Sequence, residues 1–316
     1  MLVLVAPGQG AQKPGFLAPW LEVPGVTDLL RQWSEAIDLD LIQYGTEGDA
    51  DQIRDTAVAQ PLLVASALAS ARALLGDTPT DRAAGVVAGH SVGELAAAAL
   101  SGALTPVESM RLVRRRGQAM AEAATVTETG MAALLGGDPE TVTPHLEKLG
   151  LTPANINGAG QIVAAGTLEQ LAALAEDKPE GVRRVAPLKV AGAFHTHHME
   201  PAVSALEAAV ADLTPAEPTV CFVSNQDGGT VDSGGEILAR LVNQVSHPVR
   251  WDLCMETFQK LGVTALIELC PGGTLTGLAK RALPGLPYQA LKTPEDLEPA
   301  RQLIAEHGAD AVRGTE

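Results

Sequence analysis

The sequence has few aromatic residues, few cysteines and fewer basic than acidic side chains. Aromatic residues make up 3% of the 316 residues and hydrophobic ones 46%, so a core must be built from aliphatic side chains. The 22 basic and 38 acidic residues give a formal net charge of −16, which makes nucleic acid an unfavourable partner. Cys221, Cys254 and Cys270 form an odd, widely spaced set, which argues for reduced thiols in a cytoplasmic protein.

Signals for export or membrane insertion are also lacking. Residues 1–5 contain no basic segment, and a Pro-Gly turn at residues 7–8 follows too early for a signal peptide. No apolar run approaches the roughly 20 residues that a membrane span needs. We therefore expect no membrane association, and a length of 316 residues suits one large domain or two.

One stretch combines a strand, a glycine-flanked serine and a helix. An apolar run starting at Val86 leads into Gly89-His90-Ser91-Val92-Gly93, and a run rich in alanine and leucine follows Glu94. Gly-x-Ser-x-Gly alone is common and usually marks a turn, but this context is that of a nucleophile elbow. Glycines there avoid clashes around a strained serine, and the following helix N-terminus stabilises negative charge. The sequence therefore predicts Ser91 as a nucleophile.

A serine nucleophile needs a base, and residues 193–199 contain three histidines. His195, His197 and His198 could instead ligate zinc, because His-x-His is a metal-binding pattern. Only Glu200 is an acid nearby and the cysteines are distant, so a base is favoured over a metal. A simpler alternative leaves His197 and His198 exposed to solvent. No acidic partner for the base stands out, so a backbone carbonyl is a candidate to orient the imidazole.

The helix predicted from residue 106 to about residue 122 carries four arginines. It begins with a capping signal formed by Thr105, Pro106 and Glu108. One polar stripe, predicted to face solvent, contains Arg111, Arg115, Gln118 and Glu122. Arg116 instead shares an apolar stripe with Leu112, Val113 and Met120. It either snorkels outward along its stem or is buried and binds an anion, from a protein carboxylate or a substrate.

The remaining pattern predicts an α/β protein with a small inserted unit. A strand at residues 2–6 precedes the Gly-rich loop 7–12, either an ordinary turn or a loop whose Gln9 amide reaches a site at the sheet edge. Gln60 begins an apolar helix, with Pro61 in its first turn. Within residues 124–190 the pattern predicts a βαββαβ order, with elements at 131–135, 139–149, 153–157, 161–165, 168–176 and 182–190. A strand at 219–223 that leads into a turn at Ser224-Asn225, a strand at 264–269 and a last helix after residue 273 follow.

Several motifs, in order over nearly the whole chain, resemble those of malonyl-CoA:acyl-carrier-protein transacylases. They are Gly8-Gln9-Gly10-Ala11-Gln12, Gly89-His90-Ser91-Val92-Gly93-Glu94, Arg116-Gly117, Gly192-Ala193-Phe194-His195, His247-Pro248-Val249-Arg250-Trp251 and the stretch 268–278. The resemblance implies an α/β-hydrolase-like core with a parallel sheet, formed by residues 1–123 and 191–316, and an inserted ferredoxin-like subdomain at 124–190. It also implies ping-pong transfer of a malonyl group from malonyl-CoA to the phosphopantetheine thiol of holo acyl carrier protein, through a malonyl-serine intermediate.

The resemblance also assigns roles to individual residues. Ser91 is the nucleophile and His195 the base, because the methionine four residues after the family histidine falls on Met199. Gln9 and the backbone N–H of Val92 bind the oxyanion, Arg116 holds the malonyl carboxylate, and the backbone carbonyl of Gln244 orients His195. No cofactor and no metal are implied, and we expect a monomer.

Selectivity for malonyl over methylmalonyl groups is expected from Phe194 and Val92. In the related acyltransferases, Ala-Phe-His at the base and an apolar residue after the nucleophile accompany malonyl use. Methylmalonyl enzymes carry Ser before that histidine and Gln after the serine. Phe194 would fill the space that an α-methyl branch needs, and the alternative is that it is only a core residue. Gly192 departs from the family, where histidine is common.

An acidic carrier protein must be recruited by a local basic patch on a chain of net charge −16. Candidates are Arg183, Arg184, Lys189, Lys280 and Arg281, although an ordinary solvated face is the commoner role for each. Two other functions remain open from the sequence. A serine hydrolase of esters or thioesters is disfavoured by Arg116 and the missing acid, and a non-catalytic acyl-binding protein is disfavoured by the serine and histidine.

Overall fold

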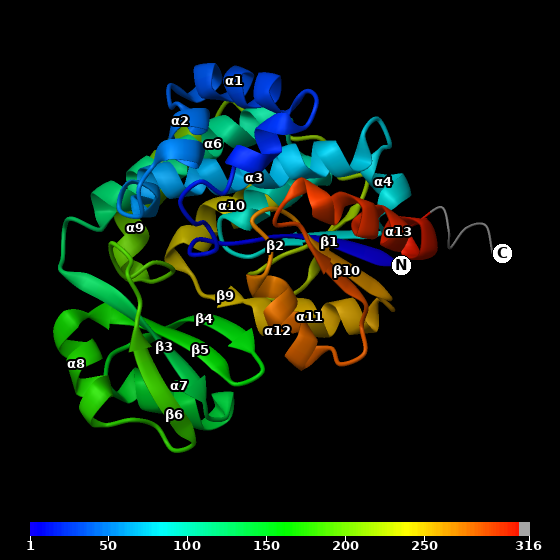
Figure 1. The fold of residues 1–316 in the computed structure, drawn as a ribbon. Coiled ribbons are helices and arrows are strands. Elements are labelled where there is room, and N and C mark those ends of the chain that lie inside the picture. The colour runs from blue at the N-terminus through cyan, green and yellow to red at the C-terminus, as the bar shows by residue number, and fades with distance from the viewer. Residues whose placement is uncertain (310–316) are drawn as a thin grey trace.

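The computed structural model describes residues 1–309, which form two β-sheets flanked by helices (Figure 1). The larger sheet has the strand order β11-β10-β1-β2-β7-β8, and all neighbouring pairs except β7 and β8 are parallel. Its strands are β1 (Leu2–Ala6), β2 (Val86–Gly89), β7 (Cys221–Val223), β8 (Thr230–Val231), β10 (Ala265–Glu268) and β11 (Tyr288–Ala290). The predicted α/β class with a parallel sheet is confirmed, and the strand at residues 2–6 has the predicted bounds.

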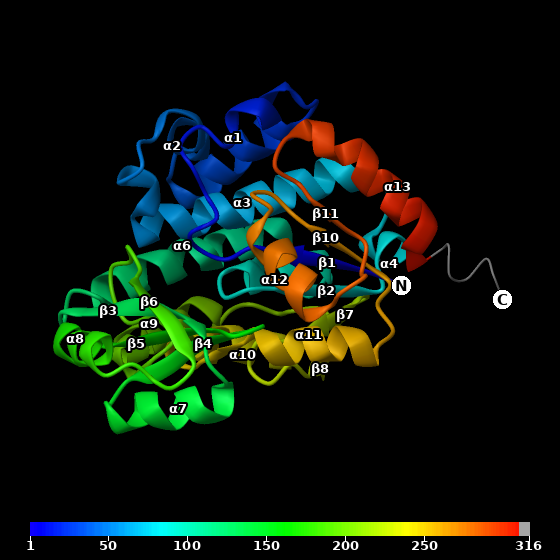
Figure 2. The same cartoon turned by 60° about the horizontal axis from the view of Figure 1, so that its bottom comes forward.

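Different helices bury the two faces of this sheet, because successive side chains of β1 point to opposite sides. Leu2 and Leu4 pack in a core with α1 (Val26–Ile37), α2 (Leu41–Glu47), α3 (Thr56–Leu75), α5 (Gly93–Leu100), α6 (Pro106–Ala123), α9 (Glu200–Val210), α10 (Gly234–Asn243) and α13 (Leu297–His307). Val3 and Val5 pack in a second core with α11 (Trp251–Lys260) and α12 (Thr274–Ala282), and Figure 2 shows α3 on one side of the larger sheet and α11 on the other. Shorter helices connect these elements: η1 (Ala18–Glu22), η2 (Gln52–Arg54), α4 (Thr80–Ala83), η3 (His197–Met199), η4 (Gln244–Ser246) and η5 (Pro294–Asp296).

Helix α3 begins earlier than its prediction. It starts at Thr56 with Asp55 as its N-cap, so Pro61 lies inside the helix and not in its first turn. A proline has no N–H to donate to the carbonyl four residues before it, here Ala57. Arg114 Nη1 on α6 donates to that oxygen at 2.8 Å instead. The interior proline is tolerated because the freed carbonyl regains a partner from the neighbouring helix.

The same helix corrects the expectation about membrane-length segments. Among residues 1–309 it is the one helix long and apolar enough to cross a membrane by length and composition, with a window of mean hydropathy 1.5. The sequence pattern concealed it because Gln60, Ser66 and Ser70 interrupt the apolar run. In the structure 83% of that window is buried inside the protein, and all three polar side chains are hydrogen-bonded there. A buried core helix of a folded protein passes the same test of length and composition.

Helix α6 has the predicted cap and orientation. Thr105 and Glu108 form the capping box at its start. The predicted polar stripe lies at the surface, exposed at Arg111, Arg115 and Glu122 and half-buried at Gln118. Arg116, on the apolar stripe, is buried with 2% of its surface exposed. The helical period thus separated the surface arginines from the buried one correctly.

The smaller sheet has the strand order β6-β3-β5-β4-β9. The predicted βαββαβ order is present as β3 (Thr129–Gly136), α7 (Pro139–Lys148), β4 (Thr152–Gly158), β5 (Gln161–Thr167), α8 (Leu168–Glu176) and β6 (Val182–Pro187). Strand β6 ends at Pro187 and not at residue 190, as expected where a residue without an N–H joins the ladder. The fifth strand, β9 (Val249–Arg250), pairs in parallel with β4 and comes from outside residues 124–190. The sheet therefore extends beyond the predicted insertion.

The chain also continues past the helix that was expected to be the last. Strand β11 and helix α13 follow α12, and β11 adds an edge strand to the larger sheet. With three residues, β11 is too short to show a hydrophobic period in the sequence. The predicted second core segment, 191–316, includes residues 310–316, which lie outside the described residues.

Candidate active site

The predicted elbow lies at the carboxyl end of β2, where the chain turns into α5. Ser91 has a φ of 53°, in the left-handed region that residues with a side chain rarely adopt. A Cβ on Gly89 would lie 2.0 Å from the carbonyl carbon of Gly93, and one on Gly93 would lie 2.3 Å from the oxygen of Ala6. Both glycines are required, because β1, the turn and α5 approach so closely that no side chain fits.

His195 is hydrogen-bonded to Ser91. Ser91 Oγ and His195 Nε2 are 2.7 Å apart, and His195 Nδ1 is 2.7 Å from the backbone oxygen of Gln244. A carbonyl oxygen can only accept, so the ring proton lies on Nδ1 and leaves Nε2 to accept the serine proton. The N–H of His195 donates to the carbonyl of Val245 at 3.0 Å. The η4 turn, which follows α10, therefore holds both the ring and the backbone of the histidine.

The imidazole is held in its neutral form. Burial lowers the pKa of His195 to about 3, the positive charge of Arg116 adds to that effect, and the hydrogen bond to the Gln244 oxygen opposes it. Its side chain is 3% exposed. Near pH 7 the ring therefore carries no charge, which is the state that a general base needs before it accepts a proton.

The other two histidines of the stretch lie away from this pair. His197 is exposed and His198 half-buried, with their ring centroids 4.1 Å apart, and neither lines the cavity at Ser91. Within residues 1–309, no group of three or more His, Cys, Asp or Glu side chains could hold a metal ion. The stretch thus contributes one histidine to the site.

Two backbone N–H groups close to Ser91 have no acceptor among residues 1–309. They belong to Val92, which precedes α5, and to Gln9, which follows β1, and both residues line the cavity at Ser91. The side-chain amide of Gln9 is already bonded, since its Nε2 donates to the backbone oxygen of Arg54 at 3.3 Å. The backbone N–H of Gln9, and not its side chain, is therefore the group available to an oxyanion.

Arg116 is buried and does not snorkel to solvent. Its Nη1 donates to Gln60 Oε1 at 2.7 Å and its Nη2 donates to Gln244 Oε1 at 2.8 Å. Burial lowers the pKa of Arg116 to about 10, and the negative charge of Glu94 opposes that shift, so the guanidinium stays charged at neutral pH. The fork of this buried cation is thus bonded to two neutral amides and, among residues 1–309, to no carboxylate.

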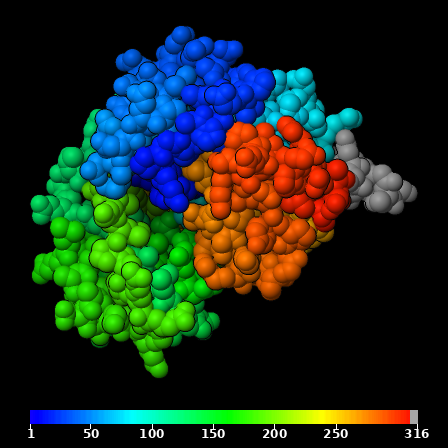
Figure 3. All heavy atoms as spheres, in the orientation of Figure 1, coloured from blue at the N-terminus to red at the C-terminus, as the bar shows by residue number. Residues whose placement is uncertain are grey.

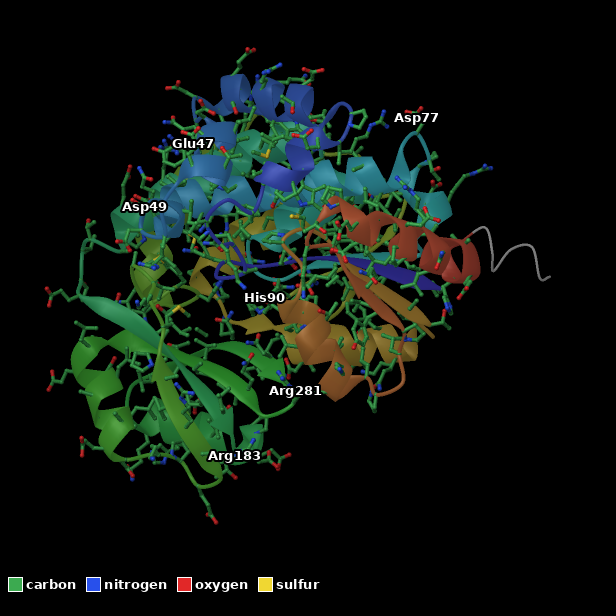
Figure 4. All side chains as sticks on the ribbon, in the orientation of Figure 1. Glu47, Asp49, Asp77, His90, Arg183 and Arg281 are labelled. Atoms are coloured by element: carbon green, nitrogen blue, oxygen red, sulfur yellow. The ribbon has the colours of Figure 1, made fainter. Side chains whose placement is uncertain are left out.

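A cavity of about 210 Å³ lies between the two sheets at Ser91. Figure 3 shows the surface hollowed where the N-terminal segment, the smaller sheet and α12 meet, and Figure 4 places His90 between the two sheets. Gln60 and Phe194 line the cavity, whereas Arg116 does not. Gln60 therefore contacts both the cavity and the guanidinium of Arg116.

The smaller sheet supplies carboxamides to the opposite wall of the cavity. Asn155, Asn157 and Gln161 all line it. Asn157 Oδ1 is 2.8 Å from His90 Nε2, and Asn157 Nδ2 donates to Gln161 at 3.0 Å. Asn155 is 8% exposed, and its Oδ1 has no hydrogen-bond partner within residues 1–309. One wall of the cavity is therefore rich in amide donors and acceptors.

Sequence reasoning missed two buried residues that support the elbow. Asn225, expected only as part of a turn, accepts the Ser91 N–H on Oδ1 at 2.7 Å and donates to the oxygen of Gly89 at 2.6 Å. Glu94 accepts the backbone N–H of Asn225 and, at 2.5 Å, Nε2 of Gln244. A glutamate opening an otherwise apolar helix was the available signal, by the same reasoning that singled out Arg116.

The fold and this site define an acyltransferase. The chain matches the acyl transferase domain family over residues 3–295 and belongs to it. It is 48% identical over 298 residues to the malonyl CoA-acyl carrier protein transacylase of Mycobacterium tuberculosis H37Rv, covering 94% of this chain and 98% of that one. The protein of that name from Escherichia coli K12 is 34% identical over 305 residues, 95% of this chain and 98% of that one.

Solved structures of malonyl transacylases are also similar to this chain in fold. The crystal structure of MCAT from Mycobacterium tuberculosis is 47% identical, with a TM-score of 0.89 over 95% of this chain and 99% of that one. A malonyl-transacylase solved in complex with a type II PKS acyl-carrier protein is 30% identical, with a TM-score of 0.88 over 95% and 99%. Within the acyltransferases, the chain therefore belongs to the malonyl CoA-acyl carrier protein transacylase family.

Proposed function

We propose that this protein transfers a malonyl group from malonyl-CoA to the phosphopantetheine thiol of holo acyl carrier protein by a ping-pong mechanism. One observation carries the proposal: Ser91 is hydrogen-bonded to a neutral histidine, and a buried arginine nearby has a fork that contacts no carboxylate of the described residues. A nucleophile with its base suits acyl transfer, and a cation kept free of acids suits an acyl group that bears a carboxylate. The names of the relatives agree with this choice.

In the first half-reaction, His195 Nε2 takes the proton of Ser91 while Oγ bonds to the thioester carbonyl carbon. The carbonyl oxygen becomes an oxyanion, which the backbone N–H groups of Gln9 and Val92 bind. When the carbon–sulfur bond breaks, coenzyme A leaves and takes the proton from His195. The Gln244 carbonyl keeps Nδ1–H in place throughout. The product is a malonyl ester on Ser91.

The second half-reaction runs the same steps toward the carrier. The phosphopantetheine thiol gives its proton to His195 and attacks the malonyl ester. The same two N–H groups bind the oxyanion, and the carbon–oxygen bond to Ser91 breaks as His195 returns the proton to Oγ. The enzyme regains its starting state, and the carrier holds the malonyl thioester.

In this mechanism Arg116 holds the malonyl carboxylate. Because Gln60 contacts both the cavity and Arg116, the incoming carboxylate would replace the Gln60 oxygen on Nη1 and accept a second N–H from the guanidinium fork. Phe194 would bound the acyl group beside the base. The carboxamides of Asn155, Asn157 and Gln161 suit the two amides of a phosphopantetheine arm, and the unpartnered Asn155 oxygen is one acceptor for it.

We infer that the larger sheet and its helices form an α/β-hydrolase-like core from residues 1–123 and 191–316, with a ferredoxin-like subdomain inserted at 124–190. The elbow after a parallel strand supports the first assignment, and the antiparallel order β6-β3-β5-β4 supports the second. The three cysteines are free thiols, in keeping with a cytoplasmic enzyme, and we expect it to act as a monomer.

We also propose that the acidic carrier protein docks on basic side chains of β6, the segment after it and α12. The candidates are exposed: Arg183, Arg184, Lys189, Lys280 and Arg281. Figure 4 places Arg183 on the smaller sheet and Arg281 on α12, so the set spans both sides of the cleft. On a chain of net charge −16, charge reversal at these positions should weaken carrier transfer and leave malonyl-CoA use unchanged.

Incubation with malonyl-CoA, followed by intact mass and addition of holo carrier protein, tests the proposed function. Wild type should gain one malonyl group and pass it to the carrier. Ser91→Ala should gain none, with a loss of roughly 10⁴- to 10⁶-fold in rate and an unchanged melting temperature. A malonyl adduct on Ser91→Ala would show another nucleophile. Rapid release of free malonate without transfer would show a hydrolase, and no reaction at all would show a binding protein.

A further inference from the structure

Glu94 is a buried carboxylate that the mechanism does not use. It is 1% exposed and lies in the first turn of α5, three residues after Ser91. One oxygen accepts the backbone N–H of Asn225, and the other accepts Nε2 of Gln244 at 2.5 Å. It contacts neither Ser91 Oγ nor the His195 ring. A charge this deeply buried is costly, so its retention calls for a reason.

The side chain of Gln244 connects Glu94 to Arg116. Its Oε1 accepts from Arg116 Nη2 at 2.8 Å, while its Nε2 donates to Glu94 and, at 3.1 Å, to the backbone oxygen of Ser91. If the amide were turned over, its oxygen would face only acceptors and its NH₂ group would face the guanidinium donors. An ionised Glu94, which can only accept, therefore fixes the amide with its oxygen toward Arg116.

Glu94 also balances the charge of Arg116 without hydrogen-bonding to its guanidinium fork. Burial raises the pKa of Glu94 to about 7, while the Asn225 N–H and the charge of Arg116 oppose the shift, so the group is a carboxylate ion above that pH. A carboxylate bonded directly to Arg116 would compete with a substrate for its fork. With one amide between them, the opposite charges still attract, and Nη1 is left facing Gln60 on the cavity side.

We propose that Glu94 is a positioning residue that aims Arg116, through the side-chain amide of Gln244, at the carboxylate of the acyl group. The proposal rests on the proposed function, because it assigns Arg116 to the malonyl carboxylate. It predicts that Glu94 sets the preference for a carboxylate-bearing acyl group over a neutral one of similar size. Its effect on the elbow through Asn225 should act equally on both groups, because both are attacked by Ser91.

The test compares malonyl-CoA with acetyl-CoA in wild type and Glu94→Gln, a change that keeps the size and removes the charge. We expect kcat/KM for malonyl-CoA to fall by roughly 10- to 100-fold more than for acetyl-CoA, the loss typical of a hydrogen bond to a charged group. The extra loss should lie mainly in KM. Equal losses for the two substrates would overturn the proposal and make Glu94 a packing residue.

A matched control is Glu268→Gln. Glu268 is also a fully buried carboxylate, and it accepts the backbone N–H groups of Gly273, Leu275 and Thr276 at the start of α12. It contacts neither Arg116 nor Gln244. Its substitution should change both substrates by the same factor. A shift in the malonyl-to-acetyl ratio as large as that of Glu94→Gln would also overturn the proposal.

Gln244→Met keeps the test decisive if Glu94→Gln does not fold. This variant removes only the side-chain amide and keeps the backbone carbonyl that orients His195. The malonyl-to-acetyl ratio should fall as it does in Glu94→Gln, and an unchanged ratio would overturn the proposal. Malonylation of wild-type Ser91 in the same assay tests the proposed function separately, so either idea can fail while the other stands.

Discussion

Replacing Arg116 by lysine or by methionine separates its charge from its geometry. The guanidinium presents Nη1 and Nη2 to two acceptors, at 2.7 and 2.8 Å, from a fully buried position. An ammonium carries its charge at one atom and cannot reproduce this planar fork. Arg116→Lys should therefore lose one charge-assisted hydrogen bond to the malonyl carboxylate, and Arg116→Met should lose both.

The magnitude follows from those two bonds. A hydrogen bond to a charged group contributes about 1.5–3 kcal/mol, so Arg116→Lys should lower kcat/KM for malonyl-CoA by roughly 10- to 100-fold and Arg116→Met by roughly 10²- to 10⁴-fold. Acetyl-CoA has no carboxylate and should be affected much less. Arg116→Met also leaves Glu94 without its counter-charge, which costs about 3 kcal/mol of folding free energy or less, because that carboxyl can take up a proton.

The assay is initial-rate transfer to holo carrier protein from each thioester, with urea unfolding of the same variants. The ratio of kcat/KM for malonyl-CoA to kcat/KM for acetyl-CoA should fall stepwise from wild type to Arg116→Lys to Arg116→Met. Equal losses for the two thioesters would refute the reasoning and make Arg116 a structural cation. Full activity of Arg116→Lys would refute the part of the argument that depends on the fork.

Two further predictions concern the base and the acyl pocket. Acetylation of Ser91 by acetyl-CoA should persist from pH 8 to pH 5, because His195, with a pKa of about 3, stays neutral there. A fall centred near pH 6.5 would contradict this, and Arg116→Met should move the acid limb upward because it removes a charge that lowers this pKa. Phe194→Ser should raise kcat/KM for methylmalonyl-CoA relative to malonyl-CoA by roughly 10- to 200-fold, the usual value of one methyl group in a tight pocket. Parallel losses for both thioesters would mean that Phe194 only packs the core.

The parts of the site that the sequence predicted are those set by local rules. The elbow is recognisable because its two glycines and serine form a pattern within five residues, and the burial of Arg116 follows from the period of one helix. Helix α8 has its predicted bounds because Thr167 and Gln170 cap it within one turn. In each case the predictive pattern lies within one short segment, even where, as at Gly93, the contact that requires the residue comes from β1.

The parts that escaped prediction depend on partners far away in the chain. The sequence predicts a helix start at Pro61. The proline lies inside the helix instead, because Arg114, 57 residues from Ala57, donates to the carbonyl that the proline frees. The sequence predicts only a turn at Asn225, whereas its side chain accepts the N–H of Ser91, 134 residues away. Strands β8 and β9 have two residues each, too few for a period of two to be recognised. No local pattern distinguishes these residues from ordinary turns and caps.

The charge of Arg116 acts both on the catalytic base His195 and on the carboxylate of the acyl group. The group that hydrogen-bonds to His195 Nδ1 is a carbonyl, and the largest charge effect on the pKa of His195 comes from the cation Arg116. That cation disfavours the imidazolium that forms in both half-reactions. A carboxylate bound at Arg116 cancels much of this unfavourable field, whereas an acetyl group leaves it in place. The malonyl carboxylate should therefore ease proton transfer as well as binding, which is stabilisation gained in the transition state. An acid behind His195, as in a serine–histidine–aspartate triad, would stabilise the imidazolium for every acyl group and weaken that discrimination.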